Sequence, residues 1–368
     1  MTAMGTEKIR EVYLQERKSY AGHTPEAGEG VLDCSLGVNP YGPPPQALEA
    51  IRRFDLRRLG DYPHTHAAHD AIVRYWSGQT KLSREDILLA DGSVSALYLI
   101  CALFAKPGAE VAGFLPSFTD MSVSVEMHGM RYVGVLPGDD TYREDVDALL
   151  AVLGPRTALV YIDCPNNPTG QVLPKAELVR VLERAGELGA YVLIDEAYGD
   201  FLPREESILT ERERFPHLLV LRTFSKGFGL AGLRAGYAIA PPELVRYMGK
   251  TSNPYVMNEL TREAAAAAME DASWPQAHSG DFARAKDALR HATGHALTLL
   301  HTDGRVPICA LRHREDVDLQ SLLYQKGVLA VSGAEFDGMD GRSVRLRIPR
   351  DGDLERLASA VRSVDLGG

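Results

Sequence analysis

The sequence has little cysteine and no long apolar run. Its four cysteines are widely scattered, with neither a Cys-x-x-Cys pair nor the spacing of a metal site: Cys34, Cys101, Cys164 and Cys309. Such usage is typical of a reducing compartment, so we expect neither disulfides nor a bound metal. No segment approaches the length of a membrane span, and the first residues lack the apolar core of a secretory signal. We therefore expect a cytoplasmic protein with no membrane partner.

Positive charge is also in short supply. The chain of 368 residues carries 40 Lys and Arg against 50 Asp and Glu, a net charge of −10, with no basic run. Nucleic acids and anionic membranes need a basic face that replaces their counterions, so this balance excludes both as partners. A composition that is 45% hydrophobic and 24% charged is ordinary for an enzyme with one large core and a smaller appended domain.

Short apolar runs alternate with helical patterns from about residue 85 to 240. The predicted strands are Ile87–Ala90, Val111–Phe114, Thr157–Ile162, Tyr191–Ile194, Leu218–Leu221 and Gly236–Ala240. The predicted helices between them are Ser93–Lys106, Phe118–His128, Glu144–Leu153 and Lys175–Leu188. This alternation indicates an α/β fold, in which a mostly parallel central sheet is flanked by helices on both faces.

The pattern changes after Pro241 to long helices, at about 242–250, 258–271 and 279–301. A strand at 306–311, a helix at 316–325 and a last strand and helix from 343 to about 361 follow, which indicates a smaller α+β domain. We predict an N-terminal arm at 1–44, a large domain at 45–250 and a small C-terminal domain at 251–368.

Three motifs follow predicted strands and should therefore meet at one edge of the sheet. Pro-Asn-Asn-Pro-Thr-Gly lies at 165–170, Asp195 follows the strand at 191–194, and Lys226 lies in the segment Ser-Lys-Gly-Phe-Gly. Ligands of such sheets bind at the carboxyl ends of the strands. A lysine amine can form a Schiff base with pyridoxal 5′-phosphate, and a carboxylate can keep its pyridine nitrogen protonated. Lys226 and Asp195 are the candidates for these roles.

Five further motifs occur along the chain: Asn-Pro-Tyr-Gly-Pro at 39–43, Asp-Tyr-Pro at 61–63, Asp-Gly-Ser at 91–93, Pro-Ser-Phe at 116–118 and Leu-Arg-Ile at 346–348. Together with the three above, they resemble the fold-type I, aspartate aminotransferase superfamily, in particular its histidinol-phosphate aminotransferase branch. The resemblance implies a pyridoxal 5′-phosphate enzyme with that fold. It also implies a homodimer whose subunits share their active sites.

The resemblance assigns a role to each matching residue. It implies that Lys226, Asp195 and Tyr198 are catalytic. The cofactor-binding set that it implies is Gly92, Ser93, Val94, Phe118, Asn167, Asp195, Tyr198, Thr223, Ser225, Lys226 and Arg234, with Tyr62 supplied by the other subunit. The implied substrate-binding residues are Arg347 for the carboxylate, with Tyr20 and Asn39 in the N-terminal segment. Strand alternation places Arg345 and Arg347 on the same face, so the carboxylate role falls on either of them.

Two other patterns carry no function. The glycines 227, 229 and 232 have the dinucleotide-binding spacing, but they follow Ser-Lys and lack an acidic residue at a strand end about twenty positions later. His64, His66 and His69 lead into a predicted helix, where solvated histidines are commoner than metal ligands. No metal is predicted.

The chain departs from the histidinol-phosphate branch at residues 327–336. The segment Gly-Val-Leu-Ala-Val-Ser-Gly-Ala-Glu-Phe lacks the arginine that in the branch helps to hold the substrate phosphate, and an unpaired phosphate would cost several kcal/mol. We predict an aminotransferase that moves an amino group from a non-phosphorylated L-amino acid to a 2-oxo acid, in amino-acid or specialised-metabolite biosynthesis. The alternative is a lyase or oxidase on the same scaffold, namely decarboxylation, elimination or oxygen-dependent oxidation. A true histidinol-phosphate aminotransferase ranks below both.

Overall fold

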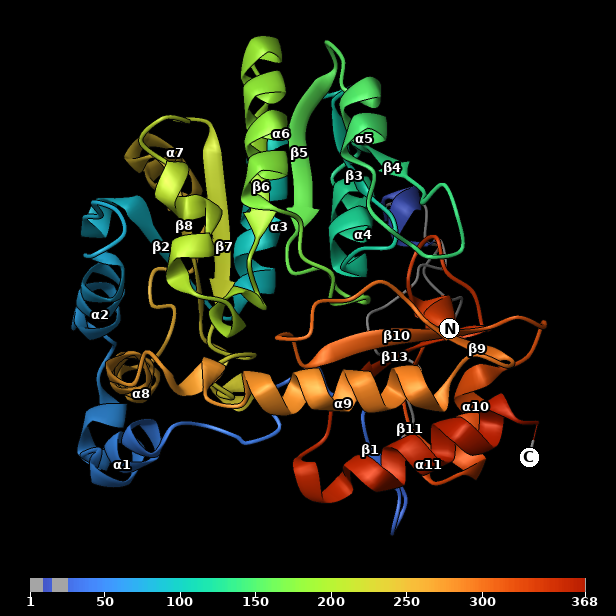
Figure 1. The fold of residues 1–368 in the computed structure, drawn as a ribbon. Helices are drawn as coiled ribbons and strands as arrows, with labels where there is room; N and C mark the ends of the chain where they lie inside the picture. The colour runs from blue at the N-terminus through green and yellow to red at the C-terminus, as the bar shows by residue number, and fades with distance from the viewer. Residues whose placement is uncertain (1–8, 15–25, 368) are drawn as a thin grey trace, which may run out of the picture.

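The structure is a computed structural model that describes residues 9–14 and 26–367. Its larger part is built on a seven-stranded sheet with the order β2-β8-β7-β6-β5-β3-β4 (Figure 1). The strands are β2 (Ile87–Ala90), β3 (Glu110–Phe114), β4 (Arg131–Val135), β5 (Thr157–Asp163), β6 (Tyr191–Asp195), β7 (Leu218–Thr223) and β8 (Gly236–Ile239). Of these strands, β8 alone runs antiparallel to its neighbours. The α/β class predicted from the alternation of strands and helices is confirmed.

Helices cover both faces of this sheet because its strands are apolar on both sides. On β6, Val192 and Ile194 belong to one core cluster, whereas Leu193 belongs to the cluster on the opposite face. The helices of the larger part are α1 (Pro45–Arg53), α2 (Ala67–Trp76), α3 (Ser93–Phe104), α4 (Thr119–Met127), α5 (Val146–Val152), α6 (Lys175–Leu188), α7 (Pro242–Met248) and α8 (Glu259–Glu270). Buried residues of α3, α4 and α7 pack on one face, and those of α2, α5, α6 and α8 on the other.

The smaller part contains an antiparallel sheet with the order β12-β13-β10-β9 and a parallel pair of β1 with β11. Its strands are β1 (Leu32–Asp33), β9 (Leu297–Leu299), β10 (Ile308–His313), β11 (Val328–Leu329), β12 (Val331–Ser332) and β13 (Ser343–Arg347), and its helices are α9 (Ser279–Ala292), α10 (Leu319–Gln325) and α11 (Leu354–Asp365). Because β1 pairs with β11, the segment that follows β1 runs directly to the junction of the two parts.

The prediction of one helix over 279–301 is wrong. Helix α9 ends at Ala292, and β9 begins at Leu297. The carboxylate of Asp365 accepts hydrogen bonds from the backbone amides of residues 294–297, at 2.7 to 3.2 Å. A carboxylate from the far end of the chain thus stabilises a turn that local sequence does not reveal.

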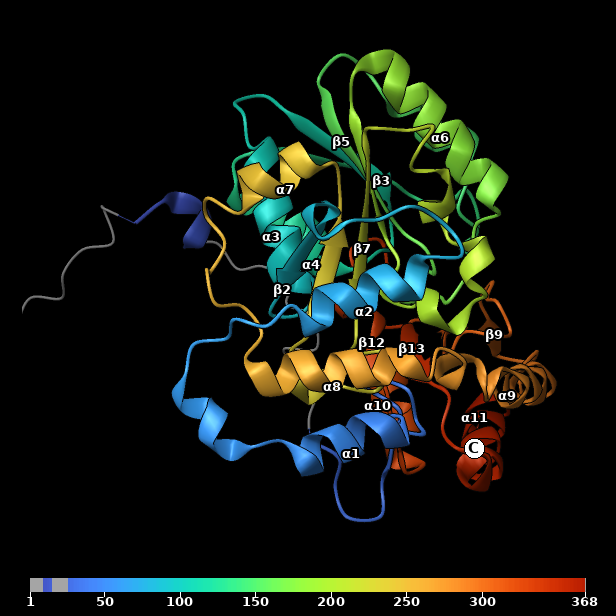
Figure 2. The same ribbon diagram turned by 90° about the vertical axis from the view of Figure 1, so that its left-hand side faces the viewer.

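Strand β4 and helix α1 were not predicted, and helix α2 was predicted only as a helix after the histidine cluster, without bounds. The strand Arg-Tyr-Val-Gly-Val is short and begins with an exposed charge, so its apolar signal is weak. Helix α8 lies beside α1 and α2 (Figure 2), and Ala265, Ala268 and Met269 of α8 share a core cluster with the large sheet. The domain boundaries at 44/45 and 250/251 stay predictions.

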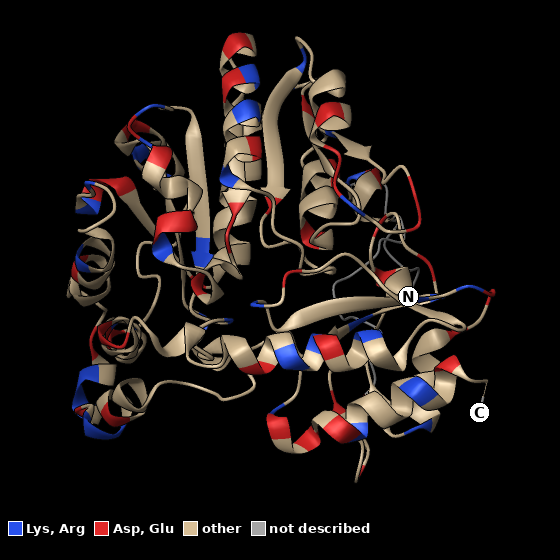
Figure 3. Ribbon diagram, viewed as in Figure 1, with Lys and Arg blue, Asp and Glu red and all other residues tan. Residues whose placement is uncertain are grey.

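Charged residues lie mainly on the outer helices (Figure 3). Helix α6 carries both signs along its length, whereas β5, β6 and β7 carry charge only at or next to their carboxyl ends, at Asp163, Asp195 and Arg222. No helix within residues 9–14 and 26–367 is long and apolar enough to cross a membrane. The same residues contain no cluster of three or more metal-ligating side chains. On β5, β6 and β7, charge therefore lies at the edge of the sheet where the three motifs begin.

Candidate active site

A cavity of about 260 Å³ lies at the carboxyl ends of β5, β6 and β7. Ten of the residues predicted for the site line it: Ser93, Val94, Phe118, Asn167, Asp195, Tyr198, Thr223, Ser225, Lys226 and Arg234. The parallel pairing of β5 with β6 and of β6 with β7 brings the ends of these strands side by side. The opposite wall is the segment 35–38, which enters from β1. Residues from distant parts of the chain therefore surround one space.

Asp195 is the buried carboxylate at the end of β6. Its Oδ2 accepts from the hydroxyl of Tyr161 at 3.2 Å, and its Oδ1 accepts from the amide of Ala197 at 3.0 Å. Burial raises the pKa of Asp195 to about 6, although these two hydrogen bonds and the charge of Lys226 act in the opposite direction. A carboxylate held this way is suited to bind a cation inside the cavity.

Lys226 lies in the loop after β7, with its Nζ 5.5 Å from the centroid of the Tyr198 ring. The backbone holds the loop: the amides of Asn39 and Gly229 each donate to the carbonyl of Lys226 at 3.1 Å. The side-chain amide of Asn39 donates to the carbonyl of Gly227 at 2.9 Å. Asn39 does not line the cavity, so the structure places this predicted substrate residue behind the lysine loop.

Tyr198 closes the cavity from the loop after β6. Its hydroxyl donates to the carbonyl of Gly37 at 2.9 Å. A Cβ atom at Gly37 would lie 2.1 Å from this hydroxyl, so only glycine permits the approach. The pairing joins the N-terminal segment to the strand that carries Asp195.

A cradle for an anion lies at the start of α3. Gly92 precedes the helix with a φ of 83°, and a Cβ atom there would lie 2.5 Å from Nη2 of Arg234. Likewise, a Cβ at Gly236 would lie 2.5 Å from the amide nitrogen of Ser93. The helix N-terminus, the guanidinium and the hydroxyls of Thr223 and Ser225 can all donate to a phosphate.

The arginines of β13 differ in placement. Arg345 is buried, and its Nη1 donates to Oδ1 of Asn167 at 3.3 Å while its Nη2 donates to the carbonyl of Ser35. Arg347 donates instead to the carbonyl of Asp33, away from the cavity lining. The structure thus brings Arg345, rather than the predicted Arg347, against residues of the site. Both lie on one face of β13, but Arg347 reaches the last residue of β1, whereas Arg345 reaches Ser35 in the segment after β1.

Tyr62 and Tyr20 are the remaining predicted residues. Tyr62 is 71% exposed, and its ring stacks on that of Tyr255 with centroids 4.1 Å apart. It does not line the cavity of its own chain. Tyr20 lies outside the described residues. The roles predicted for both stay predictions.

The family whose description is "Aminotransferase class I and II" matches residues 29–363. The chain belongs to this family. Curated relatives are named histidinol-phosphate aminotransferase: that of Acidovorax sp. (strain JS42) is 34% identical over 74% of this chain and 72% of its own length, and one from Burkholderia pseudomallei (strain 1710b) is 36% identical over 72% and 73%. The match to that of Dehalococcoides mccartyi (strain BAV1) is 34% identical over 62% of this chain but spans only 61% of the relative's length.

Solved aminotransferases share the fold. The histidinol-phosphate aminotransferase of Sinorhizobium meliloti, in complex with pyridoxal-5′-phosphate, superposes with a TM-score of 0.77 at 26% identity, covering 91% of each chain. That of Clostridium acetobutylicum gives 0.80 at 22% identity over 92% of this chain and 100% of its own. The Thermus thermophilus aspartate aminotransferase with maleate gives 0.79 at 22% identity over 91% of each chain.

The residues of this cavity fit pyridoxal 5′-phosphate. A lysine amine and a buried carboxylate face the same cavity, and the glycine cradle beside Arg234 leaves room for a phosphate where a Cβ atom would block it. Lys226 would hold the aldehyde carbon, Asp195 the ring nitrogen, and Arg234 with the start of α3 the phosphate.

Asp163 is a site residue that sequence reasoning missed. It pairs in register with Asp195 on the neighbouring strand, and its Oδ2 accepts from the amides of Asn167 at 2.8 Å and Phe118 at 3.2 Å. Burial raises its pKa to about 7, and the charge of Asp195 raises it further, against the hydrogen bonds from Asn167 and Asn166. The available signal was its place immediately before the motif at 165–170.

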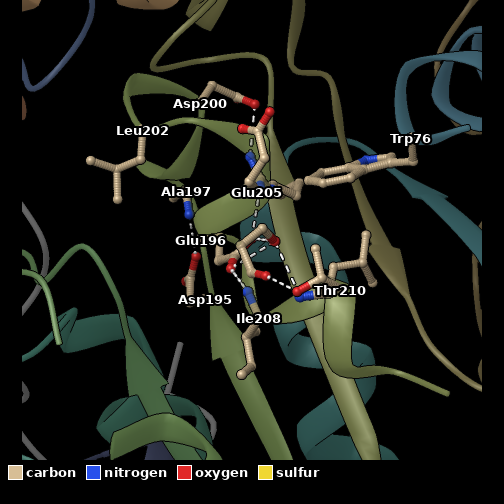
Figure 4. A network of polar contacts seen from close by, with 12 residues as sticks. Trp76, Asp195, Glu196, Ala197, Asp200, Leu202, Glu205, Ile208 and Thr210 are labelled. Atoms are coloured by element: carbon tan, nitrogen blue, oxygen red, sulfur yellow. Dashed lines mark hydrogen bonds and ion pairs between the residues drawn. The ribbon is translucent and has the colours of Figure 1, made fainter. Parts of the chain in front are cut away.

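A buried ion network behind the cavity was also missed (Figure 4). Arg222 on β7 contacts Glu196 at 2.6 Å and Asp200 at 2.8 Å, and its guanidinium lies 4.7 Å from the Trp76 ring centroid. The hydroxyl of Ser207 donates to Glu196 at 2.7 Å. Glu196 directly follows Asp195, so the network connects the end of β6 to β7, the strand that leads to Lys226.

Proposed function

We propose that this protein is a pyridoxal 5′-phosphate-dependent aminotransferase that moves the amino group of a non-phosphorylated L-amino acid to a 2-oxo acid. The observation that carries this proposal is the meeting of Lys226, Asp195 and the Gly92–Arg234 cradle in one cavity. When bound, the cofactor supplies an aldehyde carbon that condenses with amines and a ring that accepts electrons from the substrate α-carbon.

The chain's own groups hold the substrate and move the proton. The amine of Lys226, once displaced by the substrate amine, takes the proton from the α-carbon and returns it on the cofactor side. Asp195 stays ionised against the cation at the ring nitrogen and so favours electron flow towards the ring. The Phe118 side chain lies on the cavity wall, where it would pack against the cofactor ring.

Substrate orientation falls to the opposite wall. Arg345 is held beside Asn167 by its hydrogen bonds, and its planar guanidinium is suited to a carboxylate. Asn167 and Tyr198 can hydrogen-bond an oxygen on the ring. Binding the carboxylate on this wall directs the α-carbon towards Lys226.

Histidinol phosphate is the second candidate donor, because the curated relatives carry that name. Against it stands the segment 327–336, which forms β11, β12 and the following turn without an arginine. A phosphate bound there would lack its charge-assisted partner.

The proposal includes a cytoplasmic homodimer with shared sites. Its support is the exposure of Tyr62 and the four free cysteines, all of them buried. The class of reaction predicts that the small-molecule partners are an amino acid and a 2-oxo acid.

Mass spectrometry of the cofactor and products tests the reaction. The loaded protein is mixed, without an acceptor, with single L-amino acids and with histidinol phosphate. We expect the amine form of the cofactor and one equivalent of oxo acid from a non-phosphorylated donor. Repeated turnover with the cofactor still an aldehyde would establish a lyase or oxidase instead, and conversion by histidinol phosphate alone would establish the second candidate.

A further inference from the structure

Asp120 is a carboxylate of the cavity wall that none of the roles above uses. It is the second residue of α4, two positions after Phe118, and it lines the same cavity as Lys226. Within the part of the chain that the structure describes, no group donates a hydrogen bond to it and no Lys or Arg pairs with it. It is therefore available to a bound molecule.

The surroundings of Asp120 favour the binding of a cation. The cavity that it lines also contains the apolar side chains of Leu36, Val38, Val94 and Phe118. Burial raises the pKa of Asp120 to about 6, and no nearby positive charge opposes the shift. A half-buried carboxylate without a partner is unfavourable, and a cation that enters the cavity removes that cost.

A structural role at the helix end explains less. An acidic residue in the first turn of a helix interacts favourably with the helix dipole. Asp145, by contrast, caps α5 through a hydrogen bond to the amide of Ala148 at 3.1 Å, and Asp120 makes no such bond among the described residues.

Positively charged side chains and the carboxylate of Asp120 have different roles in this site. The cations Lys226, Arg234 and Arg345 serve the amino, phosphate and carboxylate groups common to every substrate of the proposed reaction. Among the described residues, no Lys or Arg forms an ion pair with Asp120. A negative group at the distal end of a substrate would meet the Asp120 charge, and a positive one would pair with it.

We propose that Asp120 determines the substrate class by binding a cation at the distal end of the substrate side chain, so that the donor is a basic L-amino acid and acidic or phosphorylated donors are disfavoured. This inference rests on the proposed aminotransferase function. It accords with the missing arginine at 327–336, because both features disfavour a distal anion.

Equilibrium binding tests the assignment without turnover. Hexanoate, 6-aminohexanoate and adipate have the same chain length, differ in distal charge and lack the reacting amine at C2. Calorimetry at pH 8 on the cofactor-loaded protein should show 6-aminohexanoate binding about tenfold more tightly than hexanoate, and adipate more weakly. Asp120→Asn should abolish this order. Glu183→Gln, which removes one exposed charge on α6, should preserve it. An unchanged order in Asp120→Asn would overturn the proposal.

Single-turnover kinetics separate this inference from the function on which it rests. L-lysine, L-norleucine and L-2-aminoadipate are matched donors, and the change of the cofactor to its amine form is followed by absorbance. We expect L-lysine to react fastest, and Asp120→Asn to reduce its advantage over L-norleucine about tenfold. If all three donors react and the variant slows them equally, the Asp120 role is wrong and the aminotransferase stands. If no amino acid converts the cofactor, the proposed function is wrong, whatever the calorimetry shows.

Discussion

Two arginines on β13 illustrate how much depends on single residues. Arg345 and Arg347 share a face of the strand, yet Arg345 reaches Asn167 and Arg347 reaches the carbonyl of Asp33. The planar fork of Arg345 is already beside the cavity, and its side chain is buried. We therefore assign the carboxylate of the substrate to Arg345.

Arg345→Lys should raise KM for every amino donor by about 10- to 100-fold, because a lysine cannot form the two parallel hydrogen bonds. Arg347→Lys is the matched control and should change KM less than about threefold. Steady-state kinetics with one donor and one acceptor measure both. The reverse ranking would restore the carboxylate role to Arg347.

Asp195 connects stability to pH. Its pKa in the folded protein, about 6, lies above the ordinary 3.8, so the cofactor-free protein loses stability as pH rises from about 4 to about 6. Asp195→Asn removes this cost. The cofactor-free variant should be more stable than wild type at pH 8, by roughly 3 kcal/mol, with the difference vanishing near pH 4.

Urea unfolding at both pH values measures this difference. The loaded variant should lose cofactor affinity and activity at the same time, because its amide cannot balance the ring cation. Equal unfolding midpoints of wild type and Asp195→Asn at pH 8 would show that the buried, ionised Asp195 does not destabilise the cofactor-free protein.

At the scale of elements, the ends of β6 and β7 are held by the buried network around Arg222. Burial by itself would lower the pKa of Arg222, but Glu196 and Asp200 more than reverse this and raise it above its ordinary value. The segment after Lys226 packs against the same network, since a Cβ atom at Gly227 would lie 2.6 Å from Cβ of Asp200. The network around Arg222 therefore contributes both to the stability of the fold and to the position of the loop that carries Lys226.

Arg222→Leu should lower the free energy of unfolding by about 3–5 kcal/mol, because it leaves two carboxylates buried without their cation. Arg214→Leu removes an exposed arginine that pairs with Glu211 and should cost less than about 1 kcal/mol. Urea unfolding of the cofactor-free variants compares them. If the two variants lower the free energy of unfolding by similar amounts, water reaches the buried network around Arg222.

At the scale of the whole molecule, the site lies between two sheets and is proposed to need a second chain. Tyr62 stacks on Tyr255 at the surface and not in its own cavity. Such a residue can serve the cavity of a partner subunit related by two-fold symmetry.

Mixing of variants tests this sharing. Tyr62→Ala and Lys226→Ala should each be almost inactive, but hybrid dimers would contain one site with both residues intact. Random reassembly should restore about a quarter of the wild-type activity, since half of the dimers are hybrid and each has one native site. No recovery, with hybrids demonstrated by native mass spectrometry, would show that Tyr62 serves no partner site.

The fold was largely predictable because its strands are apolar on both faces and end in motifs. Ten predicted site residues line the cavity for the same reason, since parallel strands bring their carboxyl ends together. Each failure has an identifiable cause. Strand β4 is short and partly exposed, and the end of α9 depends on Asp365, about 70 residues away. Asp120 carried no distinguishing signal, because acidic residues near helix starts are commonplace.

The sequence by itself determined the α/β architecture, the lysine and its carboxylate, and the family, because periodicity and motif order are properties of the linear chain. Tertiary structure alone decided which arginine contacts Asn167 beside the cavity, which asparagine holds the lysine loop from behind, and which acidic residue of α4 lines the cavity. These depend on where the segment after β1 crosses the ends of β5, β6 and β7. Contacts between residues so far apart in sequence are set by packing, and no local pattern records them.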